Sequence, residues 1–322
     1  MAGTLVYVEH HDGEPTKGSL GVLTQATALG GHVSAVLVGS GVEGIAAGLG
    51  AYGSGTVYVA DSAELEAPLP QPRVDVLARL VSEQGFDNVL FGASVLTADV
   101  AAGLAARLDA GLNWDLTGIE AVGDGLVGTR PALGDTVLVD AGWTATPRLA
   151  LFRTGAFEPA ERNGGTPEVV RVPVELAEWS TKARMVEQAH EEKSGPSIED
   201  ADIVVAGGRG LGEPGNFSLL EDLAKALGGA VAATRAVVDA GWYPYNTQVG
   251  QTGRVVSPKL YLACGISGAI QHKVGMQGSG TIVAINKDPN APIFEYADLA
   301  VVGDLHEIVP KLTELVRQRK GG

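Results

Sequence analysis

Between Cys264 and His272 an apolar run passes through two glycines into a short polar stretch, Gly265-Ile266-Ser267-Gly268-Ala269-Ile270-Gln271-His272. The pattern predicts a buried strand, a tight turn and the start of a helix. Such a turn points several backbone N–H groups at one spot, and Ser267 adds a hydroxyl donor, so the segment could bind a pyrophosphate. An ordinary strand-to-helix turn is the alternative, because the strict GxGxxG fingerprint is absent.

Polar residues also follow the neighbouring predicted strands, which we place at residues 203–206, 231–234, 260–264, 281–285 and 299–302. Ligands of open parallel sheets bind outside the carboxyl ends of the strands. Taken together, the polar residues predict a long ligand that lies across these strand ends. They are Arg209, Thr234, Arg235, the polar members of the segment Ser267 through His272, Asn286, and Asp304, which Leu305 follows.

Taken singly, most of these residues also have a structural explanation. Arg209, within a run of glycines, could clamp a phosphate or be a solvated loop residue, and Arg235 could be an ordinary surface arginine. The loop Val249-Gly250-Gln251-Thr252-Gly253 could wrap a heterocycle through its backbone or be a plain turn. His272 could be a satisfied interior histidine, and Cys264 is most simply a small core residue.

The elements that must position these residues alternate between strand and helix patterns, which predicts an α/β protein with two doubly wound, mostly parallel-sheet domains. In the first half, predicted strands at residues 33–38, 56–59 and 88–91 alternate with helical stretches. From about Leu112 to Val174 we expect an antiparallel extension, with a hairpin turn at Gly123-Asp124-Gly125.

A polar stretch that contains glycine and proline, around residues 188–196, indicates a linker or an exposed crossover. We therefore expect domains at residues 1–187 and 202–322, joined by residues 188–201. A frayed helix end inside a single domain is the alternative.

Two helix starts are predicted in the second domain. Ser218 and Glu221 have the spacing of a capping box, and the helix they open should end at Gly228. Asp304 and Glu307 have the same spacing before a last helix, which we expect at residues 305–317.

Composition and charge exclude several classes of protein. With 38 acidic and 23 basic residues, the net charge of −15 argues against nucleic-acid binding. The single cysteine rules out an internal disulfide, and the six histidines lack metal-ligand spacing, so we expect no metal site. No apolar run approaches the roughly 20 residues of a membrane span, and no signal region precedes the first strand. We expect a cytoplasmic protein without direct membrane insertion.

The C-terminal half closely resembles the FAD-binding half of the electron transfer flavoprotein alpha subunit. The similarity is dense from about Ile203 to Val316 and looser in the first half. It is carried by four segments in order, Val238-Asp239-Ala240-Gly241-Trp242, Gln248-Val249-Gly250-Gln251-Thr252-Gly253, Gly265 through His272, and Ile285-Asn286-Lys287-Asp288-Pro289.

The resemblance implies an electron carrier with no catalytic residue of its own, in which a beta subunit forms a heterodimer with this chain and shares one FAD. The FAD would be held mainly by a Rossmann-like C-terminal domain. Electrons would come from flavoprotein dehydrogenases, such as the acyl-CoA dehydrogenases of fatty acid beta-oxidation, and pass to the electron transfer flavoprotein-quinone oxidoreductase. The matching motifs assign FAD binding to Arg209, Thr234, Arg235, Gln248, Val249, Gly250, Gln251, Thr252, Gly265, Ser267, Gly268, Ala269, Ile270, Gln271, His272, Asn286, Asp304 and Leu305.

Within this set the resemblance places Arg235 close to the isoalloxazine, Thr252 by the flavin N5 edge and His272 near the pyrimidine carbonyl. Reduced flavin carries negative charge around N1 and the C2 carbonyl. At an effective dielectric of about 20, an arginine about 4 Å away stabilises such an anion by a few kcal/mol. Since about 59 mV corresponds to a tenfold change for a one-electron couple, Arg235 could shift the flavin potential by tens to over a hundred millivolts.

Two other classes of protein stay open on the residues alone. A nicotinamide-binding enzyme would need fingerprint glycines and an acid that binds the ribose, and residues 207–212 do not supply these cleanly. A non-redox interaction protein would use its first half to hold a partner. That half has no catalytic constellation, and we expect it to serve subunit contact.

Overall fold

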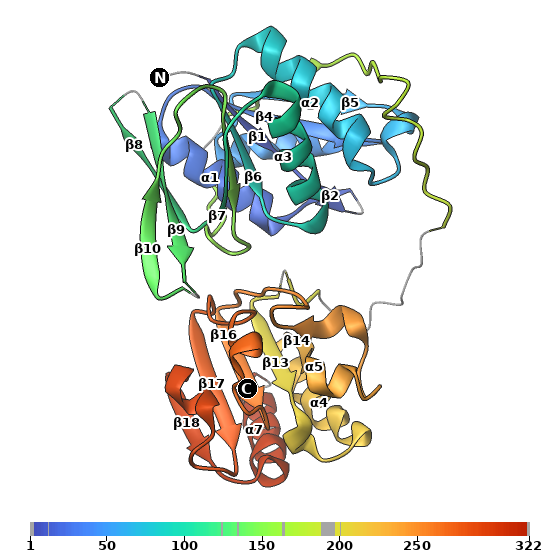
Figure 1. The fold of residues 1–322 in the computed structure, drawn as a ribbon. Helices are drawn as coiled ribbons and strands as arrows, with labels where there is room; N and C mark the ends of the chain where they lie inside the picture. The colour runs from blue at the N-terminus through green and yellow to red at the C-terminus, as the bar shows by residue number, and fades with distance from the viewer. Residues whose placement is uncertain are drawn as a thin grey trace. The chain divides into compact units, whose positions relative to one another are not determined.

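The computed structural model describes residues 3–11, 13–123, 125–133, 135–162, 165–187, 197–199 and 201–320 (Figure 1). The chain divides into two compact units, Met1–Ala189 and His190–Gly322, each built around its own parallel sheet. The predicted class, an α/β protein with two mostly parallel-sheet domains, is confirmed. Most of the predicted linker, residues 188–196 and 200, and Asp124 of the predicted hairpin turn lie outside the described residues.

The N-terminal unit contains a seven-stranded sheet with the order β12-β5-β4-β1-β6-β11-β7. A short antiparallel pair, β2 (His10–His11) and β3 (Glu14–Pro15), follows the first strand. The helices are α1 (Lys17–Leu29), α2 (Pro70–Gln84) and α3 (Val95–Leu108). The strands of the sheet are β1 (Thr4–Tyr7), β4 (Val33–Gly39), β5 (Thr56–Asp61), β6 (Asn88–Gly92), β7 (Leu112–Leu116), β11 (Arg148–Phe152) and β12 (Glu168–Arg171).

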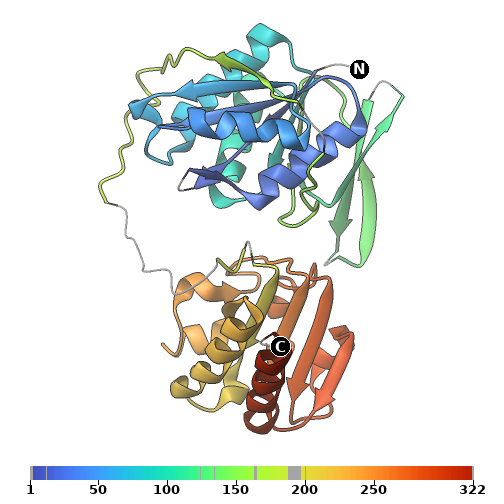
Figure 2. The same ribbon diagram turned by 180° about the vertical axis from the view of Figure 1, so that it is seen from behind.

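Both faces of this sheet are covered because its central strands are apolar on both sides. In β1, Leu5 and Tyr7 pack with buried apolar side chains of α2 and α3, whereas Val6 packs with buried apolar side chains of α1. Figure 2 shows α1 on the face opposite to α2 and α3. Near-continuous apolar strands of this kind are typical of parallel sheets that are buried on both faces.

The segment from Leu112 to Val174 is only partly antiparallel. Strands β8 (Gly118–Val122), β9 (Gly125–Ala132) and β10 (Val137–Ala141) form a three-stranded antiparallel sheet, and the Val122–Gly125 pairing gives the expected hairpin. Strands β7, β11 and β12 instead pair parallel within the main sheet, so the expectation of an antiparallel extension was wrong for them. Their pairing depends on distant segments, which a local pattern does not reveal.

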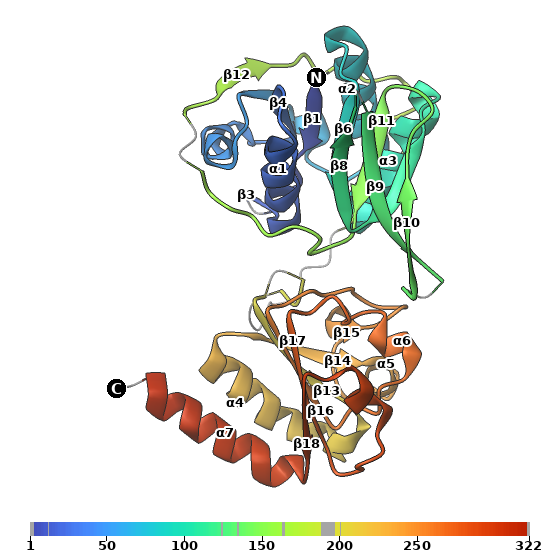
Figure 3. The ribbon, with the colours of Figure 1, turned by 90° about the vertical axis from the view of Figure 1, so that its left-hand side faces the viewer.

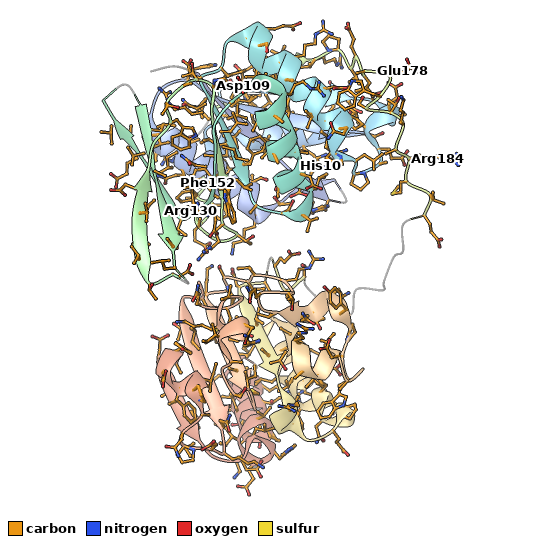
Figure 4. The ribbon with its side chains drawn as sticks, in the orientation of Figure 1. His10, Asp109, Arg130, Phe152, Glu178 and Arg184 are labelled. Carbon is orange, nitrogen blue, oxygen red and sulfur yellow. The ribbon has the colours of Figure 1, made fainter. Side chains whose placement is uncertain are left out.

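A cation–π contact links the antiparallel sheet to the main sheet. The guanidinium of Arg130 in β9, labelled in Figure 4, lies 4.5 Å from the centre of the Trp114 ring in β7. A contact of this kind contributes about 1 kcal/mol. It helps hold the hairpin against the edge of the parallel sheet.

The C-terminal unit contains a six-stranded, all-parallel sheet with the order β15-β14-β13-β16-β17-β18. Its strands are β13 (Ile203–Gly207), β14 (Ala230–Thr234), β15 (Gln248–Val249), β16 (Leu260–Cys264), β17 (Thr281–Asn286) and β18 (Leu299–Val302). Its helices are α4 (Phe217–Leu227), α5 (Arg235–Val238), α6 (Ile270–Lys273) and α7 (Leu305–Lys320).

Helices α4 and α7 lie side by side on one face of this sheet (Figure 3). Leu220 and Leu223 of α4 are fully buried there, next to Leu262 of β16. The other face is covered by shorter segments that contain Met276 and Ile293, both fully buried. The two long helices therefore cover one face of the sheet and do not cover the loops at its carboxyl edge.

One helix start differs from the prediction. Helix α4 begins at Phe217 after Asn216, with no side-chain cap, and the hydroxyl of Ser218 donates to the carbonyl of Gly215 (2.8 Å). The predicted capping box at Ser218 was therefore wrong, because the short turn Pro214–Asn216 leads directly into the helix. The expected end at Gly228 is confirmed by its left-handed backbone (φ 79°).

Candidate functional site

The parallel order of the C-terminal sheet brings the loops that follow its strands to one edge. A cavity of about 850 Å³ lies at this edge and is lined by residues that follow β13, β14, β15, β16, β17 and β18. This is the position at which open α/β sheets bind ligands. The cavity is built entirely within the C-terminal unit.

Two glycine turns interlock at the centre of this edge. The N–H groups of Gly208 and Gly210 donate to the carbonyls of Cys264 (3.1 Å) and Gly265 (2.9 Å). A Cβ on Gly210 would lie 2.5 Å from the Cα of Gly265, and Gly265 itself has a φ of +63°. Glycine is required at both positions because no side chain fits between the two backbones.

The turn after β16 presents unused hydrogen-bond donors. Within the described part of the chain, the backbone N–H groups of Ile266, Ser267, Gly268 and Ala269 donate to no protein acceptor. Three of these residues, Ile266, Ser267 and Ala269, line the cavity. Successive free N–H groups of this kind form a concavity that binds anions. The geometry of this turn suits an anion, and phosphate binding stays a prediction.

The loop after β15 is fixed to α6 by backbone hydrogen bonds. The N–H of Gln251 donates to the carbonyl of Gln271 (2.7 Å), and Gly250 has a φ of +142° and donates to the carbonyl of Arg254 (3.1 Å). The side chain of Thr252 lies within this loop, and its Oγ1 accepts from Nε2 of Gln248 (3.2 Å). The loop thus holds one hydroxyl in a defined place at the cavity wall.

Arg235 is the first residue of α5 and lines the cavity together with Thr234. Its side chain is 64% exposed, and its Nε donates to Oδ2 of Asp239 (3.1 Å), which also lines the cavity. A pair this exposed is weak. The guanidinium is therefore free to exchange Asp239 for an anionic ligand.

His272 is 6% exposed, and both of its ring nitrogens have partners. Nδ1 lies 3.0 Å from the carbonyl oxygen of Val249, and Nε2 lies 2.9 Å from the hydroxyl of Tyr261. Burial lowers the pKa of His272 to about 4, although the contact with Val249 raises it. The imidazole at the cavity wall is therefore neutral near pH 7.

The cavity gathers most of the residues that the resemblance assigns to FAD binding. Three of them do not line it: Gln248 is buried behind Thr252, Gly268 packs against the backbone of Ile293, and the side chain of Ile270 is 70% exposed. Lining residues outside the expected set are Gly208, Gly210, Gly212, Ala236, Asp239, Ile266, Lys287, Asp288, Ala291, Pro292, Gly303 and His306.

Some of the lining residues outside the expected set could have been predicted from the sequence. Asp239 lies four residues after Arg235, a spacing at which side chains on a helix meet. Lys287 and Asp288 follow β17 directly, at a strand end of the kind used to find Asn286. Ala291 and Pro292 line the cavity next to Ile293, whose N–H donates to the carbonyl of Ser267 (3.0 Å), a long-range contact that no local sequence pattern predicts.

Nowhere among the described residues do three histidine, cysteine, aspartate or glutamate side chains gather in a way that could hold a metal ion. Of the helices they form, none has both the length and the apolar character required to cross a membrane.

Two family models match the chain. Residues 4–177 match the electron transfer flavoprotein domain, and residues 197–277 match the electron transfer flavoprotein FAD-binding domain. The chain is 45% identical to the electron transfer flavoprotein subunit alpha of Mycobacterium tuberculosis over the full length of both chains. It is 39% identical to the protein of the same name from Thermoanaerobacterium thermosaccharolyticum, over 98% of each chain. It is also 40% identical to the Protein FixB of Clostridium saccharobutylicum, over 99% of this chain and 96% of that one.

Proposed function

Because the chain belongs to the family of electron transfer flavoprotein alpha subunits, with FAD as its cofactor, we propose that it pairs with a beta subunit and carries electrons between redox partners. The donors in this proposal are flavoprotein dehydrogenases such as the acyl-CoA dehydrogenases of fatty acid beta-oxidation. The acceptor is the electron transfer flavoprotein-quinone oxidoreductase. A cytoplasmic location is part of the proposal.

The cavity at the carboxyl edge of the C-terminal sheet carries the proposal for FAD. Its free N–H groups at Ile266 to Ala269 suit the pyrophosphate, and Gly208, Gly210 and Gly265 line the cavity with main chain alone. The neighbouring hydroxyls and amides suit the ribityl, ribose and ring atoms. The residues present therefore fit a dinucleotide, and bound FAD would supply the redox chemistry.

Thr252 and Arg235 have distinct tasks in this proposal. Since Oγ1 of Thr252 accepts a hydrogen bond from Nε2 of Gln248, its own O–H remains available to donate to an acceptor in the cavity. Arg235 brings a positive charge to the cavity, which its sequence neighbours Thr234 and Ala236 also line. The chain thus offers one oriented hydroxyl and one cation to the flavin end of the ligand.

The functional proposal is tested by co-expressing the chain with a beta subunit and following electron transfer. We expect a yellow heterodimer whose flavin absorbance is bleached by an acyl-CoA dehydrogenase and its acyl-CoA substrate. A heterodimer without bound flavin would refute the proposal. If only NADH reduces the flavin, the nicotinamide-dependent alternative is favoured. If neither reductant bleaches the flavin, the acyl-CoA dehydrogenases are excluded as its electron donors.

Replacing Arg235 with alanine should lower the reduction potential of the bound FAD. The exposed side chain is screened by water, so we expect a loss of about 1 kcal/mol, which is roughly 40 mV for a one-electron couple. Asp239→Asn removes the competing carboxylate and should move the potential in the opposite direction. Redox titration of the three heterodimers measures both shifts, and an Arg235→Ala potential equal to the wild-type value would contradict the assigned role.

A further inference from the structure

A hydrogen-bonded chain of three groups lies behind the cavity wall and joins three elements. The hydroxyl of Tyr261 in β16 lies 2.9 Å from Nε2 of His272 in α6, and Nδ1 of His272 lies 3.0 Å from the carbonyl oxygen of Val249 in β15. The relative exposures of the three residues are 0%, 6% and 1%. The described structure gives the Tyr261 hydroxyl no other hydrogen-bond partner, so the direction of its hydrogen bond depends on which nitrogen of His272 carries the proton.

The positions of the protons follow from what each group can do. A carbonyl oxygen only accepts, so Nδ1 of His272 must carry the proton that is donated to Val249. In the neutral ring Nε2 is then an acceptor, and the Tyr261 hydroxyl donates to it. A doubly protonated ring would leave the buried hydroxyl proton without an acceptor, which is costly.

The surroundings of the ring favour the same neutral form. Burial is the largest influence on the pKa of His272 and lowers it, while the Val249 carbonyl opposes this. The adjacent cation, Lys273, lies over the ring of Tyr296 at 4.1 Å and so is directed to another partner. Burial also holds the pKa of the Tyr261 hydroxyl well above its ordinary value, so this group keeps its proton.

We propose that Tyr261 is a positioning residue for the cofactor loop at residues 249–254. The Val249 carbonyl selects the Nδ1–H form of His272, and Tyr261, by donating to Nε2, keeps this form neutral and holds the ring against the carbonyl from which the loop starts. The same arrangement leaves His272 without a proton to donate into the cavity, so the imidazole is a neutral support for the loop. The consequence for FAD rests on the proposed function, whereas the tautomer is a property of the chain itself.

The tautomer is measured by NMR on the full-length chain with 15N-labelled histidines, and the His272→Gln spectrum assigns the signal. We expect a neutral Nδ1–H ring that does not titrate between about pH 5.5 and 8. In Tyr261→Phe the Val249 carbonyl still selects Nδ1–H, but Nε2 loses its donor, so the ring should titrate closer to its ordinary pKa. Tyr243→Phe is the matched control, because that hydroxyl donates to Glu221 (3.1 Å) outside the cavity.

The effect on the cofactor is measured as the FAD dissociation constant of the heterodimer. Tyr261→Phe should raise it about fivefold, the usual effect of one hydrogen bond, and Tyr243→Phe should leave it unchanged. A wild-type ring in the Nε2–H form, or one that titrates near its ordinary pKa, would overturn the proposal even if FAD binds. So would a Tyr261→Phe heterodimer with wild-type affinity. A wild-type heterodimer that binds no FAD would refute the proposed function and leave the tautomer result standing.

Discussion

Replacing Gly210 with alanine is expected to weaken FAD binding by about ten- to a hundredfold. The added Cβ would lie 2.5 Å from the Cα and 2.7 Å from the carbonyl oxygen of Gly265, and backbone atoms cannot rotate away as a side chain can. The turns after β13 and β16 must therefore separate, which also strains the Gly210–Gly265 hydrogen bond (2.9 Å). Overpacking of this kind costs about 1–3 kcal/mol.

Titration of the heterodimer with FAD measures this loss, and the chain offers a matched control. Gly215 lies in the next turn along the chain, has no positive φ, and has nothing within 4 Å of an added Cβ. Gly215→Ala should therefore bind FAD with wild-type affinity. Equal affinities for Gly210→Ala and Gly215→Ala would show that the interlocked turns do not shape the binding site.

Replacing Arg153 with alanine should destabilise the N-terminal unit by about 2 kcal/mol. Its guanidinium donates to both oxygens of Asp115 (2.8 and 2.9 Å) and to both oxygens of Asp135 (2.8 and 3.1 Å). The two carboxylates hold the pKa of Arg153 well above its ordinary value. Asp115 and Asp135 have φ angles of 61° and 65°, so the arginine also stabilises two left-handed backbone positions.

The loss of stability expected for Arg153→Ala lies between the values typical of buried and of exposed ion pairs. Breaking a buried pair costs about 3–5 kcal/mol, but these three side chains are 20%, 27% and 24% exposed, so water screens part of the interaction. Hydrogen exchange of the amides in β6 and β11 reports the stability of this unit alone. Arg171→Ala is the control, because that pair with Glu43 is 79% and 48% exposed and should contribute under about 0.5 kcal/mol. Equal losses for the two variants would contradict this account of Arg153.

Local patterns predicted five of the six strands of the C-terminal sheet because each of these is a short apolar run between turn signals, whereas β15, only Gln248 and Val249, was not predicted. The strand predicted at residues 260–264 matches β16, and the one predicted at 299–302 matches β18. In the N-terminal unit, β11 pairs with β6 although some 60 residues separate their starts. The direction of such a pairing depends on long-range packing, so the sequence could not distinguish it from a hairpin.

The candidate site was predictable where a polar residue is the last residue of a strand, as Thr234 and Asn286 are. It was not predictable where the wall is formed by packing between loops, as at Ala291 and Pro292. The hydrogen bonds of His272 were not predictable for the same reason, because they join segments that are distant in the sequence. Its place in the sequence suggested a group near the ligand, but only the structure gives its two buried partners, Tyr261 and Val249.

The central claim is that loops at one edge of the C-terminal sheet hold the FAD. Hydrogen exchange tests it most directly, by comparing the heterodimer with and without bound FAD. We predict that FAD slows exchange at the amides of residues 208–212, 249–254 and 265–272, with the largest change at Ile266 to Ala269, where the free N–H groups lie. Unchanged exchange in all three segments of a heterodimer that has bound FAD would contradict the claim.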